Sequence, residues 1–171
     1  MTAEQASLDF GDSLSAARRR VRMARFDTSG TICPCCDGLA KAYNRKFNKT
    51  MGDMLLQLFI WEKQEPGRWR HVKQEWPHNP GTFNQEYARM TDYELIEAPD
   101  EKRVDGNPHT GNHRITRKGV SFVMGLTAVP ARLVYYKGSV IEESIEMINI
   151  AGVLGRPFNY RELWHTKDLF E

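Results

Sequence analysis

The chain has few of the features on which several classes of protein depend. It contains only three cysteines in 171 residues, and all of them fall between positions 33 and 36, so they cannot join distant segments into a disulfide framework. No apolar run approaches the roughly 20 residues that a membrane-spanning helix needs, and the N-terminus lacks the basic start and apolar stretch of a secretory signal. We therefore expect a soluble, cytoplasmic protein that does not associate with a membrane.

A strong excess of charge is also missing, as are the common catalytic motifs. The chain has 24 Lys and Arg against 22 Asp and Glu, which gives a formal net charge of +2. So small an excess does not by itself indicate a polyanionic partner, and the local distribution of charge decides the question. The sequence contains no Walker loop, dinucleotide-binding glycine pattern, nucleophile elbow or His-Glu-x-x-His zinc helix. We expect no enzymatic activity.

The residues that are present suit one folded domain with extensions. Hydrophobic residues make up 40% of the chain and include enough aromatic side chains to form a core. Asp12 is placed to cap a first helix that ends near Arg25, in which Leu14, Ala17, Val21 and Ala24 share one face. Arginines cover the rest of this helix, at positions 18, 19, 20, 22 and 25. They form either a solvated face or a contact for nucleic acid or an acidic partner.

Two helices are predicted in the next part of the chain. Asp37 is placed to cap a short helix with Leu39, Ala42, Tyr43 and Phe47 on one side. Thr50 and Asp53 resemble a capping box, and the apolar residues after Thr50 repeat at helical spacing to about Lys63. The Pro66-Gly67 pair ends this second helix.

Short elements follow, ending with another helix. Large side chains alternate over 69–72, which predicts a strand, and prolines limit the next helix to about two turns between Lys73 and Asn79. A helix starts at Thr82, with Phe83, Tyr87 and Met90 on one face. Strands are predicted near Leu95–Ile96 and over 113–116, separated by a polar loop. Thr116 caps a helix in which Val120, Val123 and Leu126 recur, closed by Pro130.

The C-terminal part begins with a predicted hairpin. Residues 133–136 and 139–141 are β-branched or aromatic, and Lys137-Gly138 lies between them as a tight turn. An apolar run at 147–154 follows, and 160–165 is predicted to form one or two helical turns. This run and the helix at 12–25 have no obvious place inside a winged-helix core, so we expect them to support a symmetric homodimer.

The order of elements from Thr50 to Pro130 is that of a winged helix-turn-helix domain. Two strings, Met90-Thr91-Asp92-Tyr93-Glu94-Leu95-Ile96-Glu97 and His113-Arg114-Ile115-Thr116-Arg117-Lys118-Gly119, resemble bacterial winged-helix regulators of the MarR and PadR type. The resemblance implies an α+β fold with a winged helix-turn-helix core at 37–128. An N-terminal helix and cysteine knuckle then occupy 1–36, and a C-terminal β-hairpin extension occupies 129–171.

A second resemblance spans more of the chain. Cys33-Pro34-Cys35-Cys36-Asp37-Gly38, the basic segment after it, the threonine-x-lysine-glycine string and the late Phe158-Asn159-Tyr160-Arg161-Glu162-Leu163 are similar to a group of uncharacterised bacteriophage proteins. This similarity implies a phage origin, and hence the cytoplasm of a bacterial host cell, together with a winged-helix core. It does not itself imply a function.

A winged helix implies a double-stranded DNA interface on particular residues. The segment 82–90 would enter the major groove, where Gln85 pairs with adenine and Arg89 reaches guanine or phosphate. Thr82 and Asn84 would hold phosphate near the helix start. The wing and the following helix would meet the DNA backbone through Arg103, His113, Arg114, Arg117 and Lys118. The leading hypothesis is therefore a phage-encoded transcriptional regulator.

Acidic residues beside the wing support a different hypothesis. Asp92, Glu94, Glu97, Asp100 and Glu101 repel phosphate, and they form an acidic surface that mimics nucleic acid or meets basic side chains. The alternative function is therefore a phage protein that binds and inhibits a host bacterial protein.

The cysteines raise the question of zinc. Cys33 and Cys36 have the C-x-x-C spacing that aims two thiolates at one tetrahedral Zn²⁺. No second C-x-x-C exists, so the other ligands would come from His71, which we favour because of its predicted strand, or from elsewhere. The remaining candidates are a second subunit and Cys35, His78, His109, His113 and His165. A metal-free structural turn is the alternative; a redox dithiol lacks its usual βαβ context.

Overall fold

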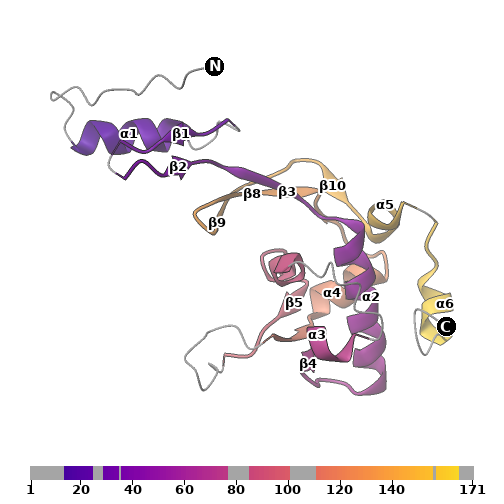
Figure 1. Cartoon of the computed structure of the whole chain (residues 1–171). Coiled ribbons are helices and arrows are strands. Elements are labelled where there is room, and N and C mark those ends of the chain that lie inside the picture. The colour runs from indigo at the N-terminus through magenta and orange to yellow at the C-terminus, as the bar shows by residue number, and fades with distance from the viewer. Residues whose placement is uncertain are drawn as a thin grey trace. The chain divides into compact units, whose positions relative to one another are not determined.

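The fold was analysed in a computed structural model of the whole chain, which describes residues 14–24, 29–34, 36–76, 85–100, 111–155 and 157–165. It is a mixed α+β fold with small antiparallel sheets (Figure 1). The chain divides into two compact units, one formed by 1–45 with 132–143 and the other by 46–131 with 144–171. Within the described residues, the helices all fall short of the length and apolar character required to span a membrane.

The first unit contains one helix and two small sheets. Its helix is α1 (Leu14–Ala24), which confirms the first predicted helix, although Asp12 and Arg25 lie outside the described residues. Strands β1 (Thr31–Ile32) and β2 (Leu39–Ala40) pair antiparallel. Strands β3 (Tyr43–Lys46), β8 (Arg132–Tyr136) and β9 (Ser139–Glu143) form a sheet in that order. Lys137 and Gly138, with φ of 51° and 81°, make the turn of the predicted β8–β9 hairpin.

The helix predicted after Asp37 is wrong, because the chain forms β2 and β3 there. Asp37 has a φ of 52°, which belongs to a reversing turn and not to a helix cap. Ala40 and Ala42 are 6% and 4% exposed, whereas Leu39 is 57% exposed. Burial therefore follows the two-residue period of a strand, which small alanine side chains mark only weakly.

The second unit surrounds the long helix α2 (Lys49–Gln64). After it come β4 (Arg70–His71), α3 (Val72–Glu75), the 3₁₀ helix η1 (Gln85–Thr91), β5 (Ile96–Glu97), β6 (Asn112–Ile115) and α4 (Arg117–Val123). The unit ends with β7 (Val129–Pro130), β10 (Met147–Ile148), α5 (Ile150–Leu154) and α6 (Tyr160–His165). Strands β4, β6 and β5 form an antiparallel sheet with β6 in the middle, and β7 pairs with β10. The predicted strand near 69–72, the strand near 95–96 and the C-terminal helix are confirmed in type and place.

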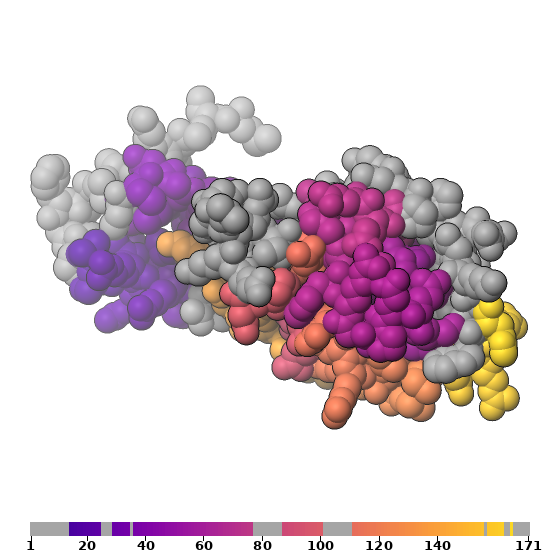
Figure 2. Space-filling view, turned by 90° about the horizontal axis from the view of Figure 1, so that it is seen from below, coloured from indigo at the N-terminus to yellow at the C-terminus, as the bar shows by residue number. Residues whose placement is uncertain are grey.

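Helix α2 carries most of the core of this unit. Every residue from Met54 to Trp61 is at most 8% exposed, so this stretch is buried on all of its faces. Helices α4, α5 and η1 and strand β6 pack around it. In Figure 2 the purple-to-magenta surface of α2, β4 and α3 lies against the orange surface of β6 and α4. The predicted helix is confirmed, but it begins two residues earlier than expected.

The N-cap of α2 is Asn48, not Thr50. The Asn48 side-chain oxygen accepts a hydrogen bond from the Met51 amide at 3.0 Å, which satisfies one of the unpaired amides of the first turn. Asparagine is among the strongest N-cap residues and threonine is weaker. Thr50 therefore lies inside the helix and is not its N-cap.

The apolar run at 147–154 is used mainly inside the second unit. Ile150, Val153 and Leu154 are buried in α5, which packs on α2. The approach is close, because a Cβ at Gly52 of α2 would lie 2.6 Å from the Val153 side chain. Met147 at the start of the run is open, at 54% exposure. The expected homodimer stays a prediction, and α5 has a place in the core that the sequence did not reveal.

The threonine-x-lysine-glycine string has a structural explanation at the start of α4. Thr116 caps the helix as predicted, accepting a hydrogen bond from the Gly119 amide at 3.0 Å. The Thr116 hydroxyl and amide in turn donate to the Glu94 and Leu95 carbonyl oxygens at 2.6 and 3.0 Å. A Cβ at Gly119 would lie 2.2 Å from the Leu95 carbonyl oxygen. Glycine is therefore required for α4 to approach the segment that leads into β5.

Helix α4 is shorter than its apolar spacing predicts. It ends at Val123, and Gly125 follows with a φ of 72°. Leu126 is 73% exposed, so its place on the predicted helical face is wrong. Pro130 does not close the helix but pairs with Met147 in the β7–β10 ladder. The turn at Gly125 rotates Leu126 off the helix face.

We predict that Gly119→Ala destabilises the second unit by about 1–3 kcal/mol, because the added methyl group meets backbone that cannot move aside cheaply. Urea titration of wild type and variant gives the two free energies of unfolding, whose difference is the destabilisation. Gly38→Ala is the matched control, since a Cβ there meets nothing closer than the Cys36 sulfur at 3.4 Å. Equal stabilities for the two variants would contradict the close approach.

Candidate nucleic-acid interface and cysteine turn

Most of the described basic residues predicted to contact DNA lie on two adjacent elements, β6 and the first turn of α4. Arg114 is in β6 and is half-buried, whereas Arg117 and Lys118 open α4 and are exposed. The two elements are joined by Thr116 alone, so the cap at this residue fixes where the three side chains start. The structure thus gathers part of the predicted set on one side of the second unit.

Arg114 is held in place by an aromatic ring and a carboxylate. Its guanidinium carbon lies 4.3 Å from the centre of the Trp69 ring, within the range of a cation–π interaction. Its Nε donates to a Glu97 carboxylate oxygen at 2.5 Å. The contact with Trp69 follows from the β4–β6 pairing, in which Arg70 faces His113. Sequence reasoning missed Trp69 because this pairing joins segments about 40 residues apart.

Lys118 is paired with the acidic residue that precedes β5. Its ammonium lies 2.8 Å from a Glu94 carboxylate oxygen. The hydrogen bond and charge of Lys118 lower the pKa of the Glu94 carboxyl below its usual range. Glu94 and Glu97, two members of the predicted acidic surface, are therefore each neutralised by a cation of the predicted DNA-binding set. Asp92 and Asp100 are exposed, and Glu101 lies outside the described residues.

The predicted recognition segment is only partly described. Arg89 lies in η1 and is half-buried; Tyr87 and Met90 are buried at 7% and 0% exposure, as predicted for their shared face. Gln85 begins η1, but its side chain lies outside the described residues, and so do Thr82, Asn84 and Arg103. The described part of this segment, Gln85–Thr91, is a 3₁₀ helix, in which residues three apart share a face.

His113 is largely buried, whereas the other predicted basic contacts on β6 and α4 are half-buried or exposed. It is 7% exposed, and its ring packs edge-on against Tyr87 with the centroids 5.3 Å apart. Burial raises the pKa of the Tyr87 hydroxyl. In β6, burial alternates from His113 to Ile115, so His113 faces the core and Arg114 faces outward. This burial weighs against the expected phosphate contact through His113, which stays a prediction.

An open hollow lies beside these residues. It has a volume of about 550 Å³, and the described residues that line it are Ala88, Thr91, Glu94, Ile96, Glu97, Ala98, His113 and Thr116. These residues come from η1, β5, β6 and the segments that join β5 and β6 to their neighbours. Glu94 and Glu97 give the hollow an acidic character. Two of the basic residues that could meet phosphate, Arg114 and Lys118, are the ion-pair partners of these two carboxylates.

A partly buried ion pair supports β4, one of the two outer strands of the sheet. Arg70 in β4 is 8% exposed, and it bonds the Glu75 carboxylate at 2.8 Å across the turn into α3. The same carboxylate accepts the His71 amide at 2.9 Å. Burial by itself raises the pKa of the Glu75 carboxyl, but these two hydrogen bonds and the charges of Arg70 and Arg68 together outweigh it, and the pKa is lowered. Arg70 also lies over the Trp61 ring, which ties β4 to α2.

We predict that Glu75→Gln lowers the free energy of unfolding at pH 7 by about 1–3 kcal/mol, because it leaves the buried Arg70 without its closest charged partner. The lowered pKa of Glu75 means that this contribution is present above the carboxyl's ordinary pKa and is lost as pH falls through its folded value. The difference in the free energy of unfolding between wild type and variant therefore becomes smaller below about pH 4. Urea titrations at several pH values measure it.

Glu142→Gln is the matched control for this experiment, because Glu142 is an exposed carboxylate of β9. It should unfold as the wild type does at every pH. A Glu75→Gln variant with wild-type stability at pH 7, or a difference that widens in acid, would show that the Arg70 pair does not support β4.

The cysteine turn lies between β1 and β2. The Asp37 amide donates to the Cys33 carbonyl oxygen at 2.9 Å, and the Cys33 amide donates to the Gly38 carbonyl oxygen at 2.9 Å. Both cysteines are free thiols; Cys33 is half-buried and Cys36 is exposed. The turn is tight, as a zinc knuckle requires, and it leads into a strand instead of the expected helix.

A complete ligand set for zinc is not found around this turn. Among the ranges that the structure describes, no group of three or more His, Cys, Asp or Glu is arranged to hold a metal ion. Cys33 and Cys36 belong to the first unit and His71 to the second. The Nδ1 of His71 is buried and has no hydrogen-bond partner among the described residues. Cys35, His78 and His109 lie outside those ranges, so zinc stays a prediction.

If Cys33 and Cys36 hold zinc, chelation should lower the melting temperature, because metal binding then contributes to folding. The Cys36→Ser variant should melt like the chelated wild type and should not respond to the chelator. Elemental analysis of protein purified without added metal decides the point. A content below about 0.1 mole of zinc per mole of protein would remove the metal hypothesis.

Comparison with known proteins does not extend these observations. No protein family, no curated protein and no solved structure matches the chain.

Proposed function

We propose that the second unit is a winged helix-turn-helix domain that binds double-stranded DNA, and that the protein is a phage-encoded transcriptional regulator. One observation supports this proposal most directly. Three short strands form a sheet in the order β4-β6-β5, and they are interleaved along the chain with α2, α3, η1 and α4. In a winged helix, the last two strands are joined by a loop that meets DNA. Here the corresponding connection spans 98–111, between β5 and β6.

The charges around this sheet are compatible with DNA binding even though they are paired. Arg114–Glu97 and Lys118–Glu94 are partly or largely exposed pairs, which typically contribute about 0–1 kcal/mol each. Exchanging a carboxylate for a phosphate oxygen therefore costs little. Arg117 makes no ion pair with any described residue and can meet phosphate directly. Arg89 would act from η1, at the edge of the major groove.

The same ion pairs weigh against the acidic-surface alternative. Two of its carboxylates are already neutralised by Lys118 and Arg114. A surface that mimics DNA needs unpaired negative charge, and these two ion pairs remove part of the charge of the predicted acidic surface. The DNA-binding proposal is therefore preferred, and a host-protein partner becomes an outcome of its test.

We predict that the full chain binds a fluorescein-labelled 30-base-pair duplex and loses affinity steeply as salt rises, because bound phosphates release counterions. Arg117→Gln with Lys118→Gln removes two phosphate contacts. The slope of log K against log[salt] should then become shallower by about 1.8, at about 0.9 for each contact. Fluorescence anisotropy over a salt series gives both the affinity and the slope.

The matched control is Arg132→Gln with Lys137→Gln, two exposed cations of the β8–β9 hairpin. It removes the same charge and should leave the slope close to that of the wild type. Absence of DNA binding at low salt, together with capture of a stoichiometric protein from bacterial lysate, would reject the regulator and favour the host-protein alternative.

A further inference from the structure

We propose that the arginine face of α1 is a second binding site for the phosphate backbone of duplex DNA, separate from the winged-helix unit. We define the arginine face as Arg18, Arg19 and Arg22 with Ser15 among them. It belongs to the first unit, so it shares no residue with the proposed interface on β6 and α4. Its failure and the failure of the regulator proposal can therefore be told apart.

The arginine face lies opposite the side of α1 that packs. Ala17 is the buried residue of α1, at 4% exposure, and α1 contacts β1. With about 100° of rotation per residue, Arg18, Arg22 and Arg19 fall within an arc of roughly 100° on the other side. All three are exposed, and none of them makes an ion pair with another described residue. The packing of the helix thus leaves these guanidinium groups in solvent.

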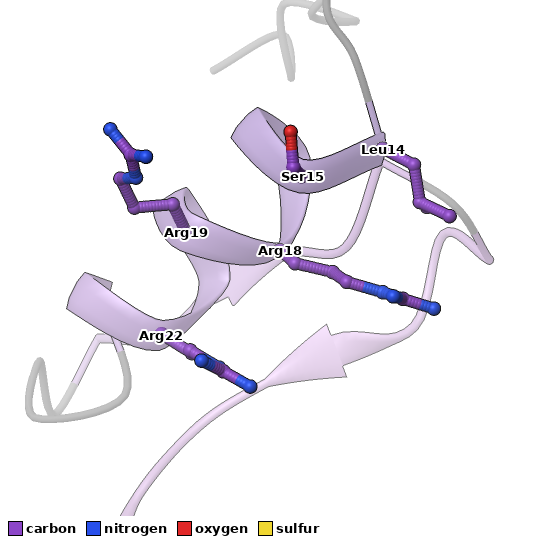
Figure 3. A pocket seen from close by; sticks show the side chains of 5 residues that line it. All are labelled: Leu14, Ser15, Arg18, Arg19 and Arg22. Atoms are coloured by element: carbon purple, nitrogen blue, oxygen red, sulfur yellow. The ribbon is translucent and has the colours of Figure 1, made fainter.

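An open hollow of about 500 Å³ runs along this face, and its described lining is Leu14, Ser15, Arg18, Arg19 and Arg22. Figure 3 shows the Arg18 and Arg22 side chains extending to the same side of the helix, and Arg19 extending away from them. Residues four apart on a helix have Cβ atoms about 5–6 Å apart, a distance that two neighbouring phosphates of one strand can match. Arg18 and Arg22 are therefore the pair that we expect to follow the strand.

The composition of α1 makes a bound anion favourable. Not one of its 11 residues is acidic, so no carboxylate within the helix offsets its arginines. Like charges four apart on a helix destabilise it by about 0.2–0.5 kcal/mol per pair. A polyanion removes this repulsion, and guanidinium groups form paired hydrogen bonds with phosphate oxygens. If the arginine face were only solvated, the repulsion between its arginines would remain.

Duplex DNA fits the face better than an acidic protein does. A protein interface usually has an apolar centre, and here the single large apolar side chain of the hollow, Leu14, lies at its edge. A run of arginines with a hydroxyl among them suits a repeating array of phosphates. The major groove is about 12 Å wide and admits an α-helix, so α1 can lie against both of its walls.

The test compares the full chain with the variant Arg18→Gln, Arg19→Gln, Arg22→Gln. Glutamine has nearly the helix propensity of arginine, and the three positions are exposed, so the variant should fold. Circular dichroism and melting temperature check this. With the labelled 30-base-pair duplex, the variant should lose roughly tenfold or more in affinity at low salt, and its salt slope should become shallower by about 2–3.

A charge-matched control shows whether a loss of DNA affinity comes from the arginine face itself or only from the lower net positive charge. Lys46→Gln, Arg132→Gln and Lys137→Gln remove three exposed cations from the β3-β8-β9 sheet. This control should keep the wild-type slope. If it loses as much affinity as the α1 variant, or if the α1 variant binds DNA as the wild type does, the inference is overturned. In the second case an acidic protein remains as the partner to seek for α1.

Combining the α1 variant with Arg117→Gln and Lys118→Gln distinguishes the two proposals. If only the α1 substitutions reduce affinity, the second site stands and the winged-helix interface fails. If only the second pair reduces affinity, the second site fails. If both sites contact one duplex, the changes in salt slope should add, because each contact releases its own counterion.

Discussion

The second unit depends on the burial of α2 on all of its faces. From Met54 to Trp61 every side chain is buried, and Gln57 is among them at 2% exposure. A helix that is apolar all round must be covered on every side, so α4, α5, η1 and β6 are all held against it. Short elements such as η1 and α5 have few hydrogen bonds of their own, and they gain stability from this contact. The positions of the sheet and of α4, and therefore of the basic residues on them, follow from it.

Two sets of local contacts connect the core around α2 with the candidate interface. Gly119 lets α4 approach the Leu95 carbonyl oxygen, and Thr116 links the start of α4 to the strand beside it. On the other side of the sheet, Arg70 is anchored by Glu75 and by the Trp61 ring of α2. The neighbouring Trp69 then supports Arg114. The guanidinium of Arg114 and the ammonium of Lys118 thus lie on rigid elements, which favours binding because little side-chain and backbone freedom remains to be lost.

Sequence patterns predicted the elements that short-range chemistry determines. The apolar spacing after Thr50 gives α2, Thr116 is a true N-cap, and Lys137-Gly138 makes the hairpin turn. Elements that depend on distant partners were missed: β3 pairs with β8, nearly 90 residues away, and the local pattern around Leu39 and Tyr43 imitates a helix. Arg114, Arg117 and Lys118 lie on β6 and the first turn of α4, and their contact with DNA stays a prediction. The inward turn of His113 and the support from Trp69 depend on the register of β4 and β6, which no local pattern encodes.

The central claim is that η1, the sheet and the start of α4 form one DNA-binding side of the second unit. Amide NMR of the ¹⁵N-labelled full chain, titrated with duplex DNA, tests it most directly, because it reports each residue separately. The account predicts that the largest shifts of the second unit fall in η1, at Asn112–Ile115 and at Arg117–Lys118, whereas the amides of α5 and α6 stay unchanged. Saturating DNA that leaves those three segments unperturbed would contradict it.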